Sequence, residues 1–524
     1  MDDAAGREAT SPRWPLAVLA AMVVAGVAFA VDATSGQLPF FDDWGLILSR
    51  RGWTVDAFLV PTGEHLSAVP VLFFKIVYAI GGLPAFWALR LIVAILAESC
   101  AVLMYFLARP RLGPVLALVP AFAVAFVGQG GDNYFWAAQI GYDGALIGGL
   151  GAFLLFDRGT RRADIGAAAL LTMALYSASF GLPVLVGAAC EVLARRDRWR
   201  RLWVVAVPAA IYVAWWIPRH QQHFVSSNVG RVPGFLVDAS VGALRAVTGL
   251  GAPAGAPLLA VGAIVIAGLL VARRREVLTP RLAGAVGMAL SFGVLAGLAR
   301  ADRLYEAATP RYLFPEAIFL CLVMVELCRG LKVRRRWVAA AIATVVAVLA
   351  VVQVHELYRR GDEFRQATDL VRPDLAALEL TEGVVAPNFS PSDVSTIQAG
   401  DYFAAIHEHG SPVHTPHDLV TAAEGYRRGS DRLMVAAERL TLVATNAPRG
   451  CRPRAETGRA AAPGSTVVVR RPGPLRIARF AAEPAARLMS PHGARWSVLR
   501  LPRDRSDRPW RVWTAPRTRI CIVA

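Results

Sequence analysis

The feature that most limits what this chain can fold into is a succession of long apolar segments separated by clusters of arginine. Such segments recur from residue 14 to residue 354, and many approach the ~20 residues that an α-helix needs to cross the hydrocarbon core of a bilayer. A soluble core does not accommodate so many of them, and the mean hydropathy of +0.44 agrees. The sequence therefore predicts a polytopic α-helical membrane protein.

The expected membrane helices number about eleven, although several of the apolar segments fall short of an average spanning helix. Their approximate ranges are 14–31, 87–108, 113–128, 140–156, 164–180, 181–194, 202–217, 252–272, 282–299, 311–328 and 337–354. A further apolar run, 66–83, carries Lys75 and is interrupted by proline and glycine. We expect this run to lie along the membrane surface. No cleavage site follows the first apolar run, which we therefore interpret as a retained helix.

The basic residues predict how these helices are oriented. They form clusters near residues 109–111, 158–162, 195–201, 273–281 and 329–336. The positive-inside rule assigns such clusters to the cytoplasm. All of them share that side if 66–83 does not cross and if 164–194 crosses twice, with a turn near residues 179–181. The N-terminus is then cytoplasmic and the C-terminal region is outside. The net charge of +17 is accordingly attributed to membrane orientation rather than to nucleic-acid binding.

This orientation gathers the distinctive polar residues in the outer loops. The first loop contains two adjacent carboxylates, Asp42 and Asp43, which are candidates for function because carboxylates are costly near hydrocarbon. The alternative is an ordinary solvated loop whose aspartates cap a helix. The fourth loop contains three arginines although a short outer loop should be poor in arginine. Because guanidinium groups match phosphate oxygens, this loop predicts an anionic ligand. The candidate site residues in these loops are Asp42, Asp43, Glu64, His65, Asp132, Arg300, Arg303, Arg311 and Tyr312.

Two other groups of residues have plainer interpretations. His220 and His223 in the third outer loop have i, i+3 spacing but no acidic partner close in sequence, so a metal site is not expected there. Glu191 and Glu326 lie near the inner ends of expected helices, where we expect their carboxylates to reach the membrane surface.

With these residues in view, the chain resembles the GT-C superfamily of membrane glycosyltransferases. The resemblance rests on the acidic pair in FFDDW after the first helix, the surface-lying loop GEHLSAVPVLFFKIVYAIGG, the stretch DNYFWAAQIGYDG, and PRYLFP before a late helix. It covers about the first 330 residues, and its motifs are short. The superfamily includes protein O-mannosyltransferases, lipid A aminoarabinose transferases and mycobacterial arabinosyltransferases, which use polyprenyl-phosphate sugars. The HPP-type signature of the mannosyltransferases is replaced here by GEHLSAVP, so the sugar and the acceptor stay open.

The resemblance implies an activity and roles for the candidate residues. It implies a hexosyl- or pentosyltransferase in the bacterial cytoplasmic membrane, moving a sugar from a polyprenyl-phosphate donor to a glycan, lipid or protein acceptor of the cell envelope, as in polysaccharide biosynthesis. It assigns the catalytic role to Asp43 with Asp42, and the lipid phosphate to Arg311 with Arg300 or Arg303. Supporting roles fall to Glu64, His65, Asp132 and Tyr312. No cofactor is required, although a divalent cation held by Asp42 with Asp132 or His65 is an alternative arrangement.

Three other functions stay open at this point. A transporter would favour broken helices and internal repeats, and no convincing repeat is present. A noncatalytic envelope-assembly protein would tolerate loss of the acidic pair. A ligase that uses a lipid-diphosphate donor would depend on the outer arginines more than on the acids.

The region after the last expected helix has a different composition. We divide the chain into a membrane domain at 1–354, an extracytoplasmic α/β segment at 355–449 and an extracytoplasmic β-rich, sandwich-like domain at 450–524. The expected strands lie in GVVAP, STVVVRR, PLRIARF, RWSVLRL, RVWTA and RICIVA. Cys451 and Cys521 flank the last domain in a compartment where disulfides persist, so we expect them to pair. Such a bond contributes on the order of 4 kcal/mol in the chain-entropy model.

Overall fold

The chain folds into two compact units in the computed structural model, and each is described by itself. One unit contains the chain up to Ser35 together with Gly52–Ile76 and Trp87–Phe364, and we call it the helical unit. The other contains Gly36–Arg51, Val77–Phe86 and Arg365–Ala524, and we call it the C-terminal unit. The structure describes residues 13–63, 65–219, 225–251, 255–303, 306–333, 335–392, 396–446, 451, 454, 458–470, 473–515 and 518–523.

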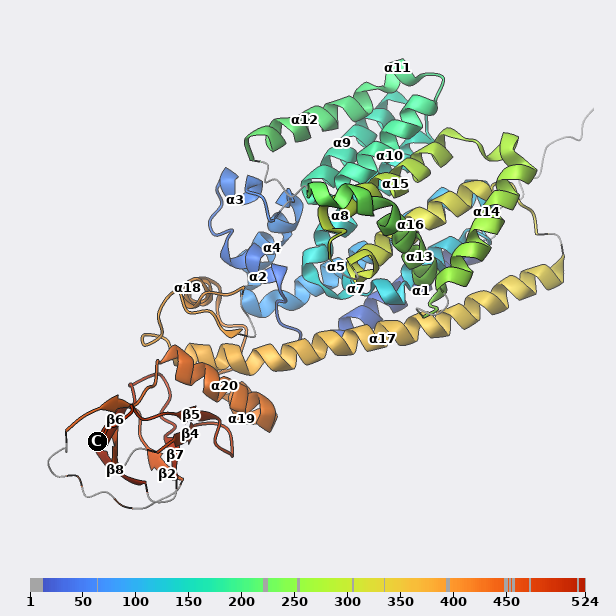
Figure 1. Cartoon of the computed structure of the whole chain (residues 1–524). Coiled ribbons are helices and arrows are strands. Elements are labelled where there is room, and N and C mark those ends of the chain that lie inside the picture. Colours follow the sequence, from blue (N-terminus) through green and yellow to red (C-terminus); the bar gives the residue numbers. More distant parts are fainter. Residues whose placement is uncertain are drawn as a thin grey trace, which may run out of the picture. The chain divides into compact units, whose positions relative to one another are not determined.

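The helical unit is built from helices over nearly its whole length (Figure 1). Their bounds are α1 Trp14–Ala33, α3 Val55–Leu59, α4 Ala68–Gly81, α5 Phe86–Leu112, α6 Leu118–Ala125, α7 Asp132–Phe135, α8 Ile140–Phe156, α9 Arg161–Ser177, α10 Gly181–Ala194, α11 Arg198–Arg201, α12 Trp203–Arg219, α13 Val232–Thr248, α14 Gly255–Val277, α15 Pro280–Arg300, α16 Pro310–Leu327 and α17 Arg336–Leu380. The boundary between the two units falls within α4, after the first residue of α5, and within α17.

Several of these helices suit a bilayer. In the described part of the chain, five are long and apolar enough to cross a membrane: Trp14–Ala33, Leu83–Leu112, Ala137–Phe156, Pro280–Arg300 and Arg336–Leu380. Shorter apolar helices occur at Ala68–Gly81, Gly181–Ala194, Trp203–Arg219 and Pro257–Ala272. The chain is therefore a membrane protein by the length and composition of its helices. The expected eleven crossings and their orientation stay predictions.

Small residues determine how closely the central helices pack. Helix α8 packs against α9 and α10, and α10 packs against α15 (Figure 1). A Cβ atom added at Gly148 of α8 would lie 2.6 Å from the carbonyl oxygen of Leu170 in α9. A Cβ atom at Gly187 of α10 would lie 2.7 Å from the Cβ atom of Met288 in α15. Glycine at these positions therefore permits the close helix contacts that stabilise packing in membranes.

The direction of the helices divides the helical unit into two ends. Helices α8 and α16 run from the end that carries Tyr142 and Tyr312 to the end that carries Asp157 and Glu326. Helix α15 runs the opposite way and finishes at Arg300. We call the first end the loop end and the second the basic end.

The basic end is held together by ion pairs whose arginines are buried. Arg281 donates to Glu191 and, at 3.1 Å, to Asp157. Arg111 also pairs with Asp157, at 3.2 Å, and with Glu326. Glu191 and Glu326 are buried, so the expectation that their carboxylates reach the membrane surface is wrong. Arginines from neighbouring helices satisfy these carboxylates inside the protein instead.

The C-terminal unit begins along the chain with the short helix α2, Asp42–Leu48, and continues from the second half of α17. Helix α17 continues well beyond residue 354, the expected end of the last apolar segment, and Pro373 lies inside it. Leu357, Phe364 and Leu375 are buried, and their spacing of seven and eleven residues keeps one apolar face along the helix. The remaining helices are α18 Ala399–His409, α19 His417–Thr421 and α20 Glu424–Ala437.

The described residues of this unit also form two four-stranded antiparallel sheets, with strand orders β1-β6-β3-β8 and β2-β7-β4-β5. The strands are β1 Val443–Ala444, β2 Arg459–Ala461, β3 Thr466–Arg470, β4 Leu475–Ala478, β5 Ala486–Leu488, β6 Trp496–Arg500, β7 Trp510–Thr514 and β8 Arg519–Val523. Apolar side chains such as Val467, Leu499, Ile477 and Val512 are fully buried. The β-rich expectation is met, whereas GVVAP lies in turns after α17 and forms no strand.

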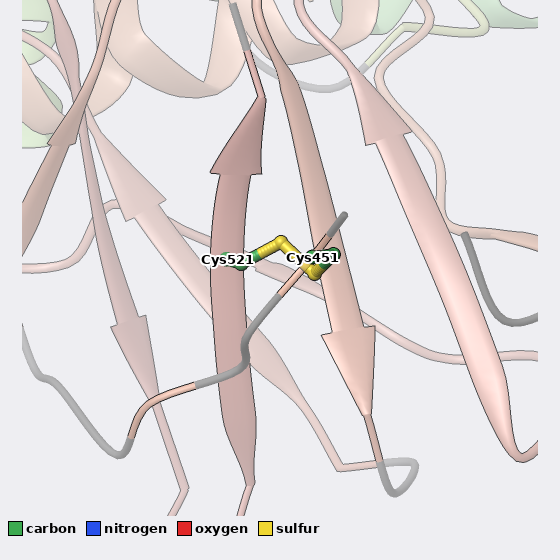
Figure 2. The surroundings of a disulfide bond; sticks show 2 residues. All are labelled: Cys451 and Cys521. Atoms are coloured by element: carbon green, nitrogen blue, oxygen red, sulfur yellow. A yellow bond between two sulfur atoms is a disulfide. The ribbon is translucent and has the colours of Figure 1, made fainter. Parts of the chain in front are cut away.

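The expected disulfide is present. Figure 2 shows Cys451 bonded to Cys521, which lies on β8. The two Cα atoms are 6.0 Å apart and 70 residues apart in sequence. Arg454 also exchanges backbone hydrogen bonds with Ile520 of β8. The covalent bond and this bridge together attach Cys451 and Arg454 to β8, at the edge of the sheet.

Candidate functional site

The predicted acidic pair opens helix α2 of the C-terminal unit. Asp42 is exposed, whereas Asp43 is fully buried. The backbone N–H of Phe40 donates to Oδ2 of Asp43 at 2.9 Å, and Asp43 lies close enough to Tyr78 for the two groups to interact electrostatically. Trp44, the next residue, is buried with its ring against that of Tyr402. The two adjacent carboxylates therefore occupy different environments, one in solvent and one inside the protein.

The arginines of the predicted fourth loop converge on an aromatic ring at the loop end of the helical unit. Helix α15 ends at Arg300, and α16 begins at Pro310, so the connection between them brings Arg300 and Arg311 together. Their guanidinium carbons lie 5.9 and 5.2 Å from the ring centroid of Tyr312, within cation–π range. Tyr312 is buried, so its ring is a fixed support for both cations.

A chain of rings connects this pair of arginines to His65. The ring of Tyr142, in the first turn of α8, lies parallel to that of Tyr312 at 6.5 Å. His65 lies edge-on to Tyr142 at 6.1 Å, and backbone hydrogen bonds with Thr62 fix its position in a tight turn. The structure thus brings His65, Arg300, Arg311 and Tyr312 into one cluster within the helical unit. Tyr142 joins them as a residue that was not expected.

Asp132 lies next to this cluster and forms an ion pair with an arginine. Nε of Arg360, on α17, donates to Oδ1 of Asp132 at 2.8 Å. Burial raises the pKa of the Asp132 carboxyl, and the charges of Arg360 and Arg311 offset part of that increase. Asp132 is therefore a structural anchor for Arg360 and an electrostatic neighbour of Arg311.

A polar cavity of about 410 Å³ opens at the same end. Pro310, directly before Arg311, lines it, and so does Arg360, the partner of Asp132. Its volume lies in the range of small-ligand pockets, about 300–1,000 Å³. Its walls offer both hydrogen-bond donors and acceptors, because arginine, glutamine and glutamate side chains are among them. The residues that line it are Gly128, Gln129, Arg245, Gly249, Gly251, Ala308, Pro310, Leu313, Glu356, Arg359, Arg360 and Glu363.

Other predicted residues lie outside the cluster or outside the described residues. Arg303 is exposed beyond the end of α15, next to Asp302. Glu64, His220 and His223 belong to the residues that the structure does not describe. Among the residues that it does describe, no three His, Cys, Asp or Glu side chains are grouped to hold a metal ion.

Sequence reasoning missed Tyr142, Arg360 and the cavity. Tyr142 depends on helix packing, because only the fold brings the start of α8 against the start of α16. Arg360 had a usable signal. The pair Arg359–Arg360 follows the last expected membrane helix on the side that the positive-inside rule leaves poor in arginine.

Comparison with known proteins adds one distant likeness. No protein-family model and no curated protein matches the chain. Among solved structures, it is similar to the archaeal oligosaccharyltransferase AglB from Archaeoglobus fulgidus in complex with an inhibitory peptide and a dolichol-phosphate. The identity is 12% and the TM-score 0.41, over 82% of this chain and 69% of that one. A likeness at this level identifies neither activity nor substrate.

Proposed function

We propose that this membrane protein is a glycosyltransferase that moves a sugar from a polyprenyl-phosphate donor to an acceptor of the cell envelope. The observation that carries the proposal is the convergence of Arg300 and Arg311 on Tyr312 beside a polar cavity. Two guanidinium groups fixed on an aromatic ring suit the oxygens of a lipid phosphate. The adjoining cavity offers the mixture of donors and acceptors that a sugar requires.

The arginines have a defined task in such a reaction. The acceptor hydroxyl attacks the anomeric carbon of the donor sugar, and the bond between that carbon and the phosphate oxygen breaks. The phosphate leaves with the electron pair, so negative charge grows on its oxygens. Arg311 and Arg300 stabilise that charge in a site partly shielded from water. Tyr312 and His65 support them through the chain of rings, and Asp132 supports them through Arg360.

The acid–base role is assigned separately, to the acidic pair. The acceptor hydroxyl loses its proton as it attacks, and a positioned carboxylate that accepts the proton contributes about 10²–10⁴-fold to such a step. Asp43 takes this role, and Asp42 orients it. Glu64 keeps its proposed supporting role from the sequence resemblance.

A second candidate is a ligase that uses a lipid-diphosphate donor. The burial of Asp43 favours it, because such a ligase depends on the arginines and needs no exposed carboxylate. The two candidates differ in how Asp43→Asn affects turnover.

The test begins with lipid-linked sugars extracted from cells with and without the gene, since the donor accumulates when its transferase is lost. The accumulating lipid then serves as substrate for purified protein in vesicles. We expect Asp43→Asn to lower turnover about 10²–10⁴-fold. Arg311→Ala should raise the donor KM about ten- to hundredfold, the effect of losing a charged hydrogen-bond partner.

The matched control is Asp401→Asn, which removes an exposed first-turn carboxylate of α18 in the same unit as Asp43. It should leave transfer unchanged. Near-normal transfer by both Asp42→Asn and Asp43→Asn, with a strong effect of Arg311→Ala, would favour the ligase. No transfer by the natural protein, with no donor lipid accumulating when the gene is lost, would instead favour a noncatalytic envelope protein.

A further inference from the structure

The C-terminal unit contains a cavity of about 580 Å³ that no part of the proposed transfer uses. It lies where the end of α17 and the start of α19 meet the loops that follow β4 and β6. Its volume is in the range of pockets that bind small molecules, about 300–1,000 Å³. The residues that line it are Glu379, Leu380, Thr415, Pro416, Val420, Phe480, Arg505, Ser506, Asp507 and Arg508.

One side of the cavity is fixed by hydrogen bonds within the protein. Glu379 accepts from the hydroxyl groups of Tyr402 at 2.9 Å, Ser411 at 2.6 Å and Thr415 at 3.1 Å. The backbone N–H of Arg505 donates to the carbonyl oxygen of Leu380 at 3.0 Å, and its side chain pairs with Glu382. This wall is therefore preorganised before any ligand arrives.

The other side presents polar groups that are available to a ligand. Arg508 lies over the ring of Phe480, 5.1 Å from its centroid, and uses Nε to bond the carbonyl oxygen of Arg479 at 3.0 Å. Within the described residues, its terminal nitrogens and the carboxylate of Asp507 have no hydrogen-bond partner. A planar donor and an acceptor thus stand side by side on adjacent residues.

The charges of the wall select the kind of ligand. Glu379 and Asp507 balance Arg505 and Arg508, so the lining is formally neutral. An anionic ligand would meet the two carboxylates, and a cationic ligand would meet the two guanidinium groups. A neutral polyol satisfies both, because each hydroxyl donates one hydrogen bond and accepts others. Leu380, Pro416 and Val420 provide apolar surface for the C–H faces of a sugar ring.

The backbone around the cavity argues against a peptide as ligand. The lining residues belong to helices or loops, and none lies in a strand. A peptide added as a strand to a sheet edge therefore has no edge to pair with here. From these observations we infer that the C-terminal unit has a carbohydrate-binding site in this cavity, which takes a neutral oligosaccharide.

The test uses the full-length protein in nanodiscs. Its probes are neutral tetrasaccharides of glucose, mannose, galactose and arabinose, together with tetragalacturonate and a serine-rich decapeptide. Saturation-transfer NMR detects binding, and calorimetry measures Kd. At least one neutral tetrasaccharide should bind more tightly than either other probe. Val420→Trp, which fills the cavity, and Arg508→Gln should each weaken it about tenfold or more.

Matched controls separate binding from folding. Arg428→Gln changes an exposed arginine of the same unit that pairs with Glu483 and does not line the cavity, and it should leave Kd within about twofold, which is well below the loss of one charged hydrogen bond. Thermal unfolding checks that Val420→Trp and Arg508→Gln are folded. Asp43→Asn should bind the sugar as the natural protein does, so the outcome is independent of the transfer assay. The inference is overturned if no neutral tetrasaccharide binds, if Val420→Trp binds as tightly as the natural protein, or if the anionic probe or the peptide binds best.

Discussion

Arginine has different surroundings at the two ends of the helical unit. At the basic end, Arg111 and Arg281 are buried and their guanidinium groups lie against the carboxylates of Asp157, Glu191 and Glu326. At the loop end, Arg300 and Arg311 lie over the ring of Tyr312 beside a polar cavity. Arginine density alone therefore does not identify function. The two ends differ in what their arginines lie against, which is buried carboxylates at the basic end and an aromatic ring at the loop end.

The largest expected effect concerns the side of the membrane that each end faces, because labelling is all-or-none. Single cysteines replacing Thr309, at the loop end, and Thr160, at the basic end, should react with an impermeant thiol reagent added to intact cells only at position 309. The positive-inside rule is the physical reason. Residue 226, whose side chain is exposed, should react like 309. Ser430 is buried and is not used as a label site. Reaction of position 160 from outside would reverse the predicted orientation.

Removing a buried arginine from the ion pairs of the basic end should cause the next largest effect. Arg281→Ala removes a buried partner of Glu191, whose side chain is fully buried, and leaves Arg195 as the remaining partner of that carboxylate. A buried charge left without any partner typically costs about 3–5 kcal/mol, so we expect a cost at the lower end of that range. We expect a marked fall in thermal stability, measured by size exclusion after heating. Arg158→Gln, at an exposed arginine of the same end, serves as the control and should change little. If Arg281→Ala is as stable as this control, the basic end is not the structural element described here.

Part of the fold was predictable from the sequence. The basic clusters, the turn between α9 and α10 at residues 178–180, most strands of the two sheets and the disulfide follow from charge, spacing and β-propensity. The long α17 was not predictable from hydropathy, because beyond residue 354 only one face is apolar. Pro373 also lies inside this helix, although proline ordinarily interrupts a helix.

The contacts of the candidate site depend on tertiary structure. His65, Tyr142 and Tyr312 lie far apart along the chain, and only the packing of helices brings their rings together. The surroundings of the carboxylates at the basic end also depend on tertiary structure. Seen in sequence, Glu191 and Glu326 are charges near helix ends that should reach water. In the fold, neighbouring helices supply arginines that make burial tolerable.

Arg479 of the C-terminal unit is a further buried arginine that lies against carboxylates. It is buried, bonds Asp504 and lies 3.9 Å from Glu438. Burial, followed by a hydrogen bond with Asp504, raises the pKa of Glu438 to about 9. The folded state therefore keeps a proton that the unfolded state releases near its ordinary pKa of 4.5. Stability contributed by this carboxyl is complete below about pH 4.5 and declines as the pH rises towards 9.

Glu438→Gln should remove that pH dependence, since the amide resembles the neutral acid. We expect the natural protein to lose on the order of 1–3 kcal/mol between pH 5 and pH 9 through this group. Thermal unfolding at pH 5, 7 and 9 measures the slope. Glu483→Gln, at an exposed glutamate of the same unit, should keep the natural slope. Equal slopes in the natural protein and Glu438→Gln would show that Glu438 titrates normally.

The most direct measurement of the difference between the two ends is stabilisation by the proposed ligand. Nanodisc-embedded protein is heated with polyprenyl phosphate at about one hundred times its Kd, which stabilises a folded binding protein by about 2.7 kcal/mol. We expect this stabilisation for the natural protein and for Arg158→Gln at the basic end. We expect the Arg300→Gln, Arg311→Gln double variant to lose most of it, and polyprenol, which lacks the phosphate, to give none. Equal stabilisation of the double variant, or equal stabilisation by polyprenol, would contradict the assignment of the loop-end arginines to a lipid phosphate.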